Sequence, residues 1–210
     1  AGKKVLVTAG PTREPVDPVR FLTNQSSGKM GYAVAEAARD RGADVTLVTG
    51  PVALAAPGGM TVVPVETTED LYEAVTSRAA AQDVIVQAAA PADFCAERAP
   101  QKIKKQGDAP LTLTLYPTRD VAAAVGAQKR EGQFIVAFAA ETQNLTENAQ
   151  KKLLKKNASL VVANDVTRAG AGFGVDTNIA SFVTAQGVRE LPMMTKRELA
   201  DKILDEYVSG

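Results

Sequence analysis

Short apolar runs of strand length recur along this chain, and most are separated by longer stretches whose apolar positions repeat with helical spacing. The runs are rich in Val and Ile and carry few polar positions, which is typical of strands buried on both faces. They predict strands at 5–8, 45–48, 61–65, 84–87, 134–138 and 160–163, and helices at 31–41, 68–81, 119–130, 145–156 and 196–207. This alternation predicts an α/β, Rossmann-like fold of three layers, with helices on both faces of a mainly parallel sheet.

Two segments interrupt the alternation of strands and helices. Residues 91–110 contain a lysine run and little periodicity, and a loop of this length in a compact domain is a lid or binding loop, or else disordered. Residues 167–195 contain two short strand-like pieces, 179–184 and 188–192, on either side of a glycine-containing turn. The second segment therefore predicts a β-hairpin excursion near the C-terminal end.

Composition narrows the possible chemistry. The chain has 24 basic and 24 acidic residues, so no net field favours nucleic acid or a membrane as a partner. A single cysteine, Cys95, and the lack of histidine exclude an internal disulfide, a multi-cysteine zinc site, a histidine-dependent triad and a histidine-ligated metal. The length of 210 residues predicts one domain over 1–210. We expect it in the cytoplasm, because no apolar run approaches the roughly 20 residues of a membrane span and the first residues resemble no targeting segment.

The segment 5–31 carries most of the functional signal. Its strand runs into a long polar loop that ends at Ser26-Ser27-Gly28, directly before an alanine-rich helix. The first turn of a helix has unpaired N–H groups and the positive end of the helix dipole, so this start favours a phosphorylated ligand. The glycines match neither G-x-G-x-x-G nor Walker A, and a tight turn with close helix packing is the alternative. Asn24 either polarises a carbonyl group or stabilises the loop through an Asx turn.

Polar loops follow four of the predicted strands, after Thr8, Ala89, Ala140 and Ala163. Because the carboxyl ends of parallel strands meet at one edge of a sheet, these loops predict a single site. In the loop after Ala89, small residues allow a base or ribose to approach the backbone, and Asp93 is then placed to accept hydrogen bonds from it.

Several side chains of these loops have both a functional and a structural interpretation. The three lysines of 102–107 form either a flexible cationic flap over a polyphosphate or a solvated charge run. Lys152 and Lys156 either bind successive phosphates or lie on a solvated helix face. Phe138 either stacks on a base or packs in the core, and Asn164 ends a strand where its amide enters the site.

The run GPTREPVDPVRFLTNQSSGKMGYAVAEAA, followed in order by AAAPADF, KIKK, FAAET and KKNASLVVANDV, resembles bacterial phosphopantothenoylcysteine synthetase over nearly the whole chain. The resemblance implies a ligase that joins 4′-phosphopantothenate to L-cysteine with CTP and Mg²⁺, through an acyl cytidylate, and releases pyrophosphate and CMP. It also implies a homodimer with sites completed across subunits, and fusion in many bacteria to a flavin-dependent decarboxylase. Because no initiator methionine and no decarboxylase half are present, we expect an excised or stand-alone synthetase.

The resemblance also assigns roles to individual residues. Asn24 matches the asparagine that turns over the acyl nucleotide, and Lys102 matches a flap lysine that assists the nucleotide step. The turn 117–120 differs from the usual Asn-Pro-Asp, and no metal ligand is assigned among the side chains. The residues matched to the nucleotide site are Ala88, Ala89, Asp93, Lys102, Arg119, Asp120, Phe138, Lys152 and Lys156, and those matched to the phosphopantothenate site are Arg20, Asn24, Ser26, Ser27, Gly28, Gly31 and Asn164.

Two other functions fit a sheet of this type. A nicotinamide-dependent reductase is disfavoured because none of the four tyrosines has a lysine four positions later, and the second strand ends Val48-Thr49-Gly50 without the acidic residue that binds the ribose of NAD. A non-catalytic nucleotide-binding module is the other alternative. CTP-dependent release of pyrophosphate would distinguish it from the enzyme.

Overall fold

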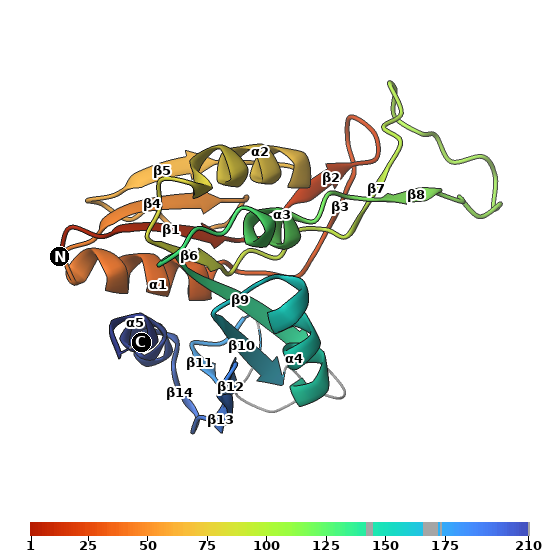
Figure 1. The fold of residues 1–210 in the computed structure, drawn as a ribbon. Helices are drawn as coiled ribbons and strands as arrows, with labels where there is room; N and C mark the ends of the chain where they lie inside the picture. Colours follow the sequence, from red (N-terminus) through yellow and green to blue (C-terminus); the bar gives the residue numbers. More distant parts are fainter. Residues whose placement is uncertain (142–144, 166–171, 173, 210) are drawn as a thin grey trace.

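The computed structural model describes residues 1–141, 145–165, 172 and 174–209, and its centre is one eight-stranded sheet (Figure 1). The strands lie in the order β13-β12-β10-β9-β6-β1-β4-β5. Their bounds are Lys4–Ala9 for β1, Asp44–Thr49 for β4, Thr61–Pro64 for β5, Val84–Gln87 for β6, Phe134–Glu141 for β9, Leu160–Asp165 for β10, Ala180–Thr184 for β12 and Gly187–Glu190 for β13.

The six predicted strands are all present and pair in parallel. The chain starts in the middle of the sheet with β1, adds β4 and β5 on one side, and returns to add β6, β9 and β10 on the other. This is the strand order of a doubly wound Rossmann-type sheet, with a topological switch point between β1 and β6. The predicted fold class is confirmed. The predicted hairpin forms β12 and β13, which extend the sheet as antiparallel strands beside β10.

The five predicted helices are also present, with one substantial change of boundary. The third was predicted over 119–130; it begins at Val121, because Asp120 is its N-cap and accepts a hydrogen bond from Ala123 N (3.0 Å), and it already ends at Ala127. The helices are α1 (Lys29–Asp40), α2 (Thr68–Ala79), α3 (Val121–Ala127), α4 (Leu145–Lys155) and α5 (Lys196–Ser209). No helix in the described part of the chain is long and apolar enough to cross a bilayer.

The helices cover both faces of the sheet. α1 and α5 pack on one face, against Val5 and Val7 of β1, while α2 and α3 pack on the other, against Leu6 and Ile85. α4 packs against β9 and β10 on the same face as α2 and α3. Successive strand side chains point to opposite faces, so a strand covered on both sides needs a continuous apolar run. The continuous Val- and Ile-rich runs of the sequence meet this requirement, and they predicted the strands for that reason.

Six short strands were not predicted. They form three two-stranded ribbons: β2 (Arg13–Pro15) with β3 (Phe21–Thr23), β7 (Phe94–Ala96) with β8 (Leu115–Pro117), and β11 (Thr177–Asn178) with β14 (Met194–Thr195). Strands β7 and β8 form the base of an arm, residues 94–117, that extends away from the sheet (Figure 1). On this arm Leu111, Leu113 and Leu115 alternate with threonines and are exposed.

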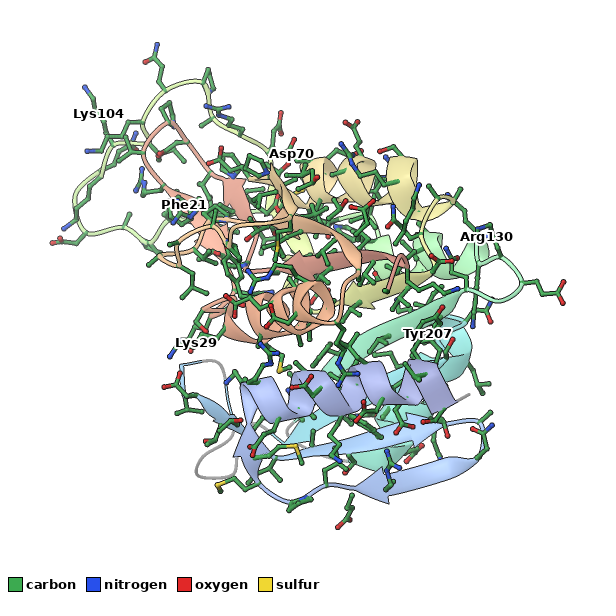
Figure 2. All side chains as sticks on the ribbon, turned by 90° about the vertical axis from the view of Figure 1, so that its left-hand side faces the viewer. Phe21, Lys29, Asp70, Lys104, Arg130 and Tyr207 are labelled. Atoms are coloured by element: carbon green, nitrogen blue, oxygen red, sulfur yellow. The ribbon has the colours of Figure 1, made fainter. Side chains whose placement is uncertain are left out.

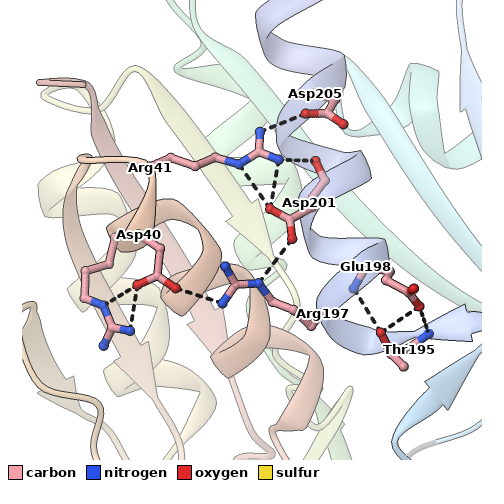
Figure 3. Close-up of polar contacts among 8 residues, drawn as sticks. Asp40, Arg41, Thr195, Arg197, Glu198, Asp201 and Asp205 are labelled. Atoms are coloured by element: carbon pink, nitrogen blue, oxygen red, sulfur yellow. Dashed lines mark hydrogen bonds and ion pairs between the residues drawn. The ribbon is translucent and has the colours of Figure 1, made fainter.

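A cluster of surface ion pairs joins α1 to α5 (Figure 3). Arg41 contacts Asp201 at 2.8 Å and Asp205 at 2.9 Å, and Arg197 contacts Asp40 at 2.9 Å and Asp201 at 3.1 Å. The side chains are partly exposed, so each pair contributes at most about 1 kcal/mol. The cluster holds α5, from Arg197 to Asp205, beside the end of α1.

Candidate active site

The loops after β1 and β6 meet at the switch point of the sheet. Ala90 N donates to Gly10 O (2.9 Å), and Pro11 forms an isolated parallel bridge with Ala90, so the two loops start side by side. A cavity of about 640 Å³ opens at this edge, where doubly wound sheets bind ligands. Its walls come from the loop before α1, the ends of β6, β9 and β10, the starts of α3 and α5, and α4.

Most of the predicted site residues line this cavity. Those that line it are Asn24, Ser26, Ser27, Gly28, Ala88, Ala89, Asp93, Arg119, Asp120, Phe138, Lys152, Lys156 and Asn164. Arg20, Gly31 and Lys102 do not line it, and each has a different explanation.

The start of α1 provides backbone donors at the cavity. Gly28 is the N-cap with a φ of 76°, a left-handed conformation that favours glycine, and no side chain caps the helix. Ser26 Oγ accepts from Gly28 N (3.4 Å) and Ser27 Oγ accepts from Lys29 N (3.5 Å), which shapes the turn. Because the first turn of a helix has unpaired N–H groups, this edge of the cavity suits an anion.

Gly31 does not line the cavity and allows close packing of α1 on β1. A Cβ at this position would lie 2.5 Å from Ala9 Cβ and 2.8 Å from Thr8 O, so only glycine lets α1 approach β1 this closely. The structural alternative stated for the glycines is therefore correct at Gly31. The contact still matters for the site, because it sets the distance between the start of α1 and the end of β1.

A buried polar network fixes the loop after β6. Thr12 Oγ1 accepts from Ala92 N (2.9 Å) and lies 2.9 Å from Thr68 Oγ1, while Ala92 O accepts from the hydroxyls of Thr68 (3.2 Å) and Thr118 (2.6 Å). Glu14, 5% exposed, accepts from the backbone N and hydroxyl of Thr68, both at 2.8 Å. The loops after β1, β6 and β8 and the start of α2 are thus joined under the cavity. The cavity wall at Ala92 is consequently well fixed.

Asn24 links two sides of the cavity. Its side-chain amide donates to Pro91 O (2.9 Å) and approaches Ala90 O (3.4 Å), so the loop before α1 is connected to the loop after β6. Neither bond closes an Asx turn in its own loop. The exposed Asn24 is therefore held at the cavity by long-range contacts.

Two lysines reach the cavity from the C-terminal end of α4, Lys152 in its last turn and Lys156 directly after it. Lys152 Nζ donates to Phe138 O (2.6 Å), and the buried Lys156 forms an ion pair with Asp120. Partial burial acts to raise the pKa of Asp120, but hydrogen bonds from Lys156 and from Ala123 N outweigh it and hold that pKa below its ordinary value. The pair anchors one ammonium group at the wall of the cavity.

Arg119, matched to the nucleotide-binding turn, lines the cavity, but its guanidinium group is engaged with α2. It lies 3.3 Å from the centroid of the Tyr72 ring and donates to Glu69 Oε1. Both partners belong to α2, so Arg119 fastens the start of α3 to that helix. The backbone of the 118–120 turn remains its contribution to the cavity wall.

Lys102 lies on the arm, Arg20 lies directly before β3 and contacts the arm at Ile103, and neither residue lines the cavity of its own chain. Arg20 binds the buried Asp17 carboxylate through Nε (3.0 Å) and donates to Ile103 O (2.6 Å), and Ile103 N donates to Asp17 Oδ2 (3.1 Å). The hydrogen bond from Arg20 holds the pKa of Asp17 well below its usual range. Figure 2 shows Lys104, in the same segment, far out on the arm and away from Lys29.

The cavity residues that were not assigned from the sequence include three polar ones that lie in or beside the main secondary structure: Gln87, Asn178 and Lys196. Lys196 is buried, and its Nζ donates to the carbonyl oxygens of Gly172 (3.0 Å), Val175 and Thr177 (3.2 Å). Burial lowers its pKa, and neighbouring Lys29 lowers it further. No local signal marked Lys196, because a lysine at the start of a helix is ordinarily a solvated surface residue.

The cavity straddles the sheet edge and has two sides. The alternation of core-facing residues in β9 and β10 places Phe138 and Asn164 on the face covered by α1 and α5. The same alternation in β6 places Gln87 on the face covered by α2 and α3. Lys152 and Lys156, at the end of α4, lie on that second face as well. A ligand filling the cavity must therefore cross the carboxyl ends of the strands.

The fold and the cavity define the class: a doubly wound α/β protein with a ligand site at its topological switch point. The chain belongs to the family of the DNA/pantothenate metabolism flavoprotein C-terminal domain, whose sequence profile matches residues 1–209. The family predicted from the motifs is confirmed.

Individual relatives agree with this assignment. The coenzyme A biosynthesis bifunctional protein CoaBC of Bacillus subtilis (strain 168) is 50% identical over 211 residues, which cover 99% of this chain and 52% of that protein. The crystal structure of a CoaBC C-terminal domain shares 43% identity at a TM-score of 0.82, covering 98% of this chain and 93% of that one. A DNA/pantothenate metabolism flavoprotein from Streptococcus pneumoniae has the same fold, with a TM-score of 0.84 at 24% identity and 99% coverage of both chains. The chain spans about half the length of the curated relatives it matches.

Proposed function

We propose that this chain ligates 4′-phosphopantothenate to L-cysteine with CTP, through an acyl cytidylate, in coenzyme A biosynthesis. One observation carries the proposal: residues assigned to the nucleotide and to the acid, from Asn24 to Asn164, line one cavity at the switch point. The 43% identity to a CoaBC C-terminal domain over nearly the whole length of both chains supports it.

In the first step, a carboxylate oxygen of phosphopantothenate attacks the α-phosphorus of CTP, an O–P bond forms, and the bond to the departing pyrophosphate breaks. The nucleophile is already an anion, so the step needs no general base, and a chain without histidine can catalyse it. Positioning and cationic stabilisation supply the catalysis. Lys152 and Lys156 on one side of the edge, with the backbone donors after Gly28 on the other, suit this task.

In the second step, the amine of cysteine attacks the acyl carbonyl, the C–N bond forms, the amine loses a proton, and CMP leaves. Negative charge develops on the acyl oxygen, and a fixed hydrogen-bond donor stabilises it. We assign this oxyanion to Asn24, whose amide group is held over the loop after β6. The assignment requires Asn24 to exchange its bond with Pro91 O for one with the intermediate.

Mg²⁺ fits this site as a companion of the triphosphate. Mg²⁺ is commonly bound by one or two carboxylates together with substrate phosphates. The described residues contain no group of three His, Cys, Asp or Glu side chains suited to a metal, but the exposed Asp93 lines the cavity and is placed to offer one carboxylate. When bound, Mg²⁺ would neutralise phosphate charge as pyrophosphate leaves.

The arm supports a homodimer in which sites are completed across subunits. Lys102 and Arg20 lie at the arm and not in the cavity of their own chain, while Leu111, Leu113 and Leu115 expose an alternating apolar stripe. Exposed apolar stripes of this type mark interaction surfaces. We therefore assign Lys102 and Arg20 to the cavity of the partner, where a flap lysine would assist the nucleotide step.

We further propose that the natural protein carries a flavin-dependent decarboxylase, since CoaBC relatives are about twice as long as the matched region. A reducing cytoplasm is the location that fits one free cysteine and these substrates.

Incubation of the chain with CTP, Mg²⁺, phosphopantothenate and cysteine tests the function, with release of pyrophosphate as the readout. Release should require phosphopantothenate, and mass spectrometry should find phosphopantothenoylcysteine. No release would refute the enzyme. Binding of NADPH without CTP would instead favour the reductase, and a parallel assay with ATP tests the choice of nucleotide.

Two variants test the division of roles. Asn24→Asp should still release pyrophosphate but accumulate the acyl cytidylate, because the second step loses its amide donor. Lys102→Gln should fail before the intermediate forms, whereas Lys104→Gln, two positions along the same exposed segment, is the matched control. Loss of pyrophosphate release in Asn24→Asp would contradict its assignment to the second step.

A further inference from the structure

Two buried side-chain atoms of the described residues lack a hydrogen-bond partner: Gln87 Nε2 and Asn164 Oδ1. Both residues line the same cavity. Buried polar atoms in folded proteins are nearly always paired, and each exception calls for an explanation. One unpaired donor and one unpaired acceptor, on two residues that line a single cavity, point to a polar ligand that pairs with these side chains.

Gln87 is the less expected of the two. It ends β6, is only 9% exposed and pairs with Ala137 of β9, and the cavity lining on its face of the sheet includes the apolar Leu71 and Val121. No acceptor in the described part of the chain pairs with Gln87 Nε2. An apolar residue would therefore be more stable at this position, unless the amide is used when a ligand is present.

Gln133 shows the ordinary environment of a buried glutamine in the same sheet. It precedes β9, is 5% exposed, and its Nε2 donates to Ala79 O and Gln82 O, both at 2.8 Å. Gln133 lies outside the cavity, at the opposite ends of the parallel strands. The two glutamines share burial and size and differ in whether the protein itself satisfies the amide.

We propose that Gln87 is a nucleotide-binding residue, whose amide N–H donates to an oxygen of the nucleoside triphosphate on the α2 and α3 face of the sheet edge. The inference rests on the proposed function. Rotation by a half turn about χ3 of Gln87 exchanges the positions of Oε1 and Nε2, so that Nε2 can face the cavity. Asn164, on the other face, accepts from a donor group of the ligands there. Together they explain why the cavity straddles the sheet.

The test compares Gln87→Met with Gln133→Met, since methionine has a similar length and no donor. CTP binding with Mg²⁺ is measured by calorimetry, and Tm is measured without ligand. Gln87→Met should bind CTP about tenfold more weakly and melt at the same temperature or about 2–4 °C higher, because an unpaired buried amide is removed. Gln133→Met should bind CTP like the wild type and melt several degrees lower.

CTP affinity of Gln87→Met equal to that of the wild type would overturn the assignment. A lower Tm of Gln87→Met, as expected for Gln133→Met, would overturn it as well, because the amide would then serve the free protein. If the wild type itself does not bind CTP, the proposed function fails and this inference falls with it. If the wild type binds CTP, an unchanged CTP affinity or a lower Tm of Gln87→Met refutes the role of Gln87 and leaves the proposed function intact.

Discussion

The ion pair between Lys156 and Asp120 is predicted to be asymmetric, because its two members are unequally buried. The Lys156 side chain is 10% exposed and the Asp120 side chain 45% exposed. Removal of the lysine leaves a carboxylate that water can reach. Removal of the negative charge leaves an ammonium group that water reaches poorly. The two single substitutions should therefore have very different effects on the free energy of unfolding.

The magnitudes follow from this difference in exposure. Breaking a fully buried pair destabilises by about 3–5 kcal/mol, and an exposed pair contributes at most about 1 kcal/mol. Asp120→Asn preserves the N-cap and a neutral acceptor for Lys156, so we expect a loss of about 1.5 kcal/mol, or about 3–6 °C in Tm. Lys156→Met keeps an apolar side chain in the buried position and leaves Asp120 as a hydrated carboxylate, so its loss of unfolding free energy should be below about 0.5 kcal/mol.

Urea unfolding at pH 7 measures both variants, with Lys151→Met as the control on the same helix, where an exposed lysine pairs with Glu147 at 2.6 Å. The control should stay within about 0.5 kcal/mol of the wild type. Saturating CTP should reduce the loss in Asp120→Asn, because phosphate oxygens would then partner Lys156, and should stabilise Lys156→Met far less than the wild type. Equal losses in the two variants, or a larger loss in Lys156→Met, would refute the reasoning.

Three further predictions concern packing, pH and the arm. Gly31→Ala should lower stability by about 2–3 kcal/mol and weaken ligand binding, because its Cβ would collide with Ala9; unchanged urea unfolding would contradict this. Hydrogen bonds from Arg39 and Arg197 hold the pKa of Asp40 below its ordinary value, so its contribution is present above about pH 4 and is lost as pH falls through the lower folded value. In Arg197→Met, Tm should therefore fall less steeply as the pH is lowered, and an unchanged pH dependence of Tm would show that the Asp40–Arg197 pair does not contribute to stability. Leu113→Asp should shift a dimer toward monomer in sedimentation, and an unchanged mass would remove the arm from the interface.

Much of the architecture was predictable because its causes are local. A strand covered on both faces must be apolar at every position, so the runs from Val5 and from Val84 identified strands directly. The 12-residue helix α1 was identified by its small and apolar face and by the glycine before it. The ribbons of two or three residues escaped notice, since such short and partly exposed strands have no period to detect.

The candidate site was predictable as a set of loops but not as a set of contacts. Loops after parallel strands must gather at one edge, so Asn24 and Asn164 could be placed together from the sequence. The contact between Arg20 and Ile103 could not be predicted from the sequence, because it joins residues 83 positions apart. Similarly, the pattern gave no reason to distinguish Lys156, buried and paired, from Lys151, exposed on the same helix.

The sequence by itself thus determined the α/β class, the position of the main strands and helices, and the family, because burial periodicity, capping and long motifs are properties of neighbouring residues. Only the tertiary structure decided the strand order, the separation of the arm from its own cavity, and the open amides of Gln87 and Asn164. These depend on which distant groups meet, and the free energy of a polar side chain is set by its partners and burial rather than by its place in the chain.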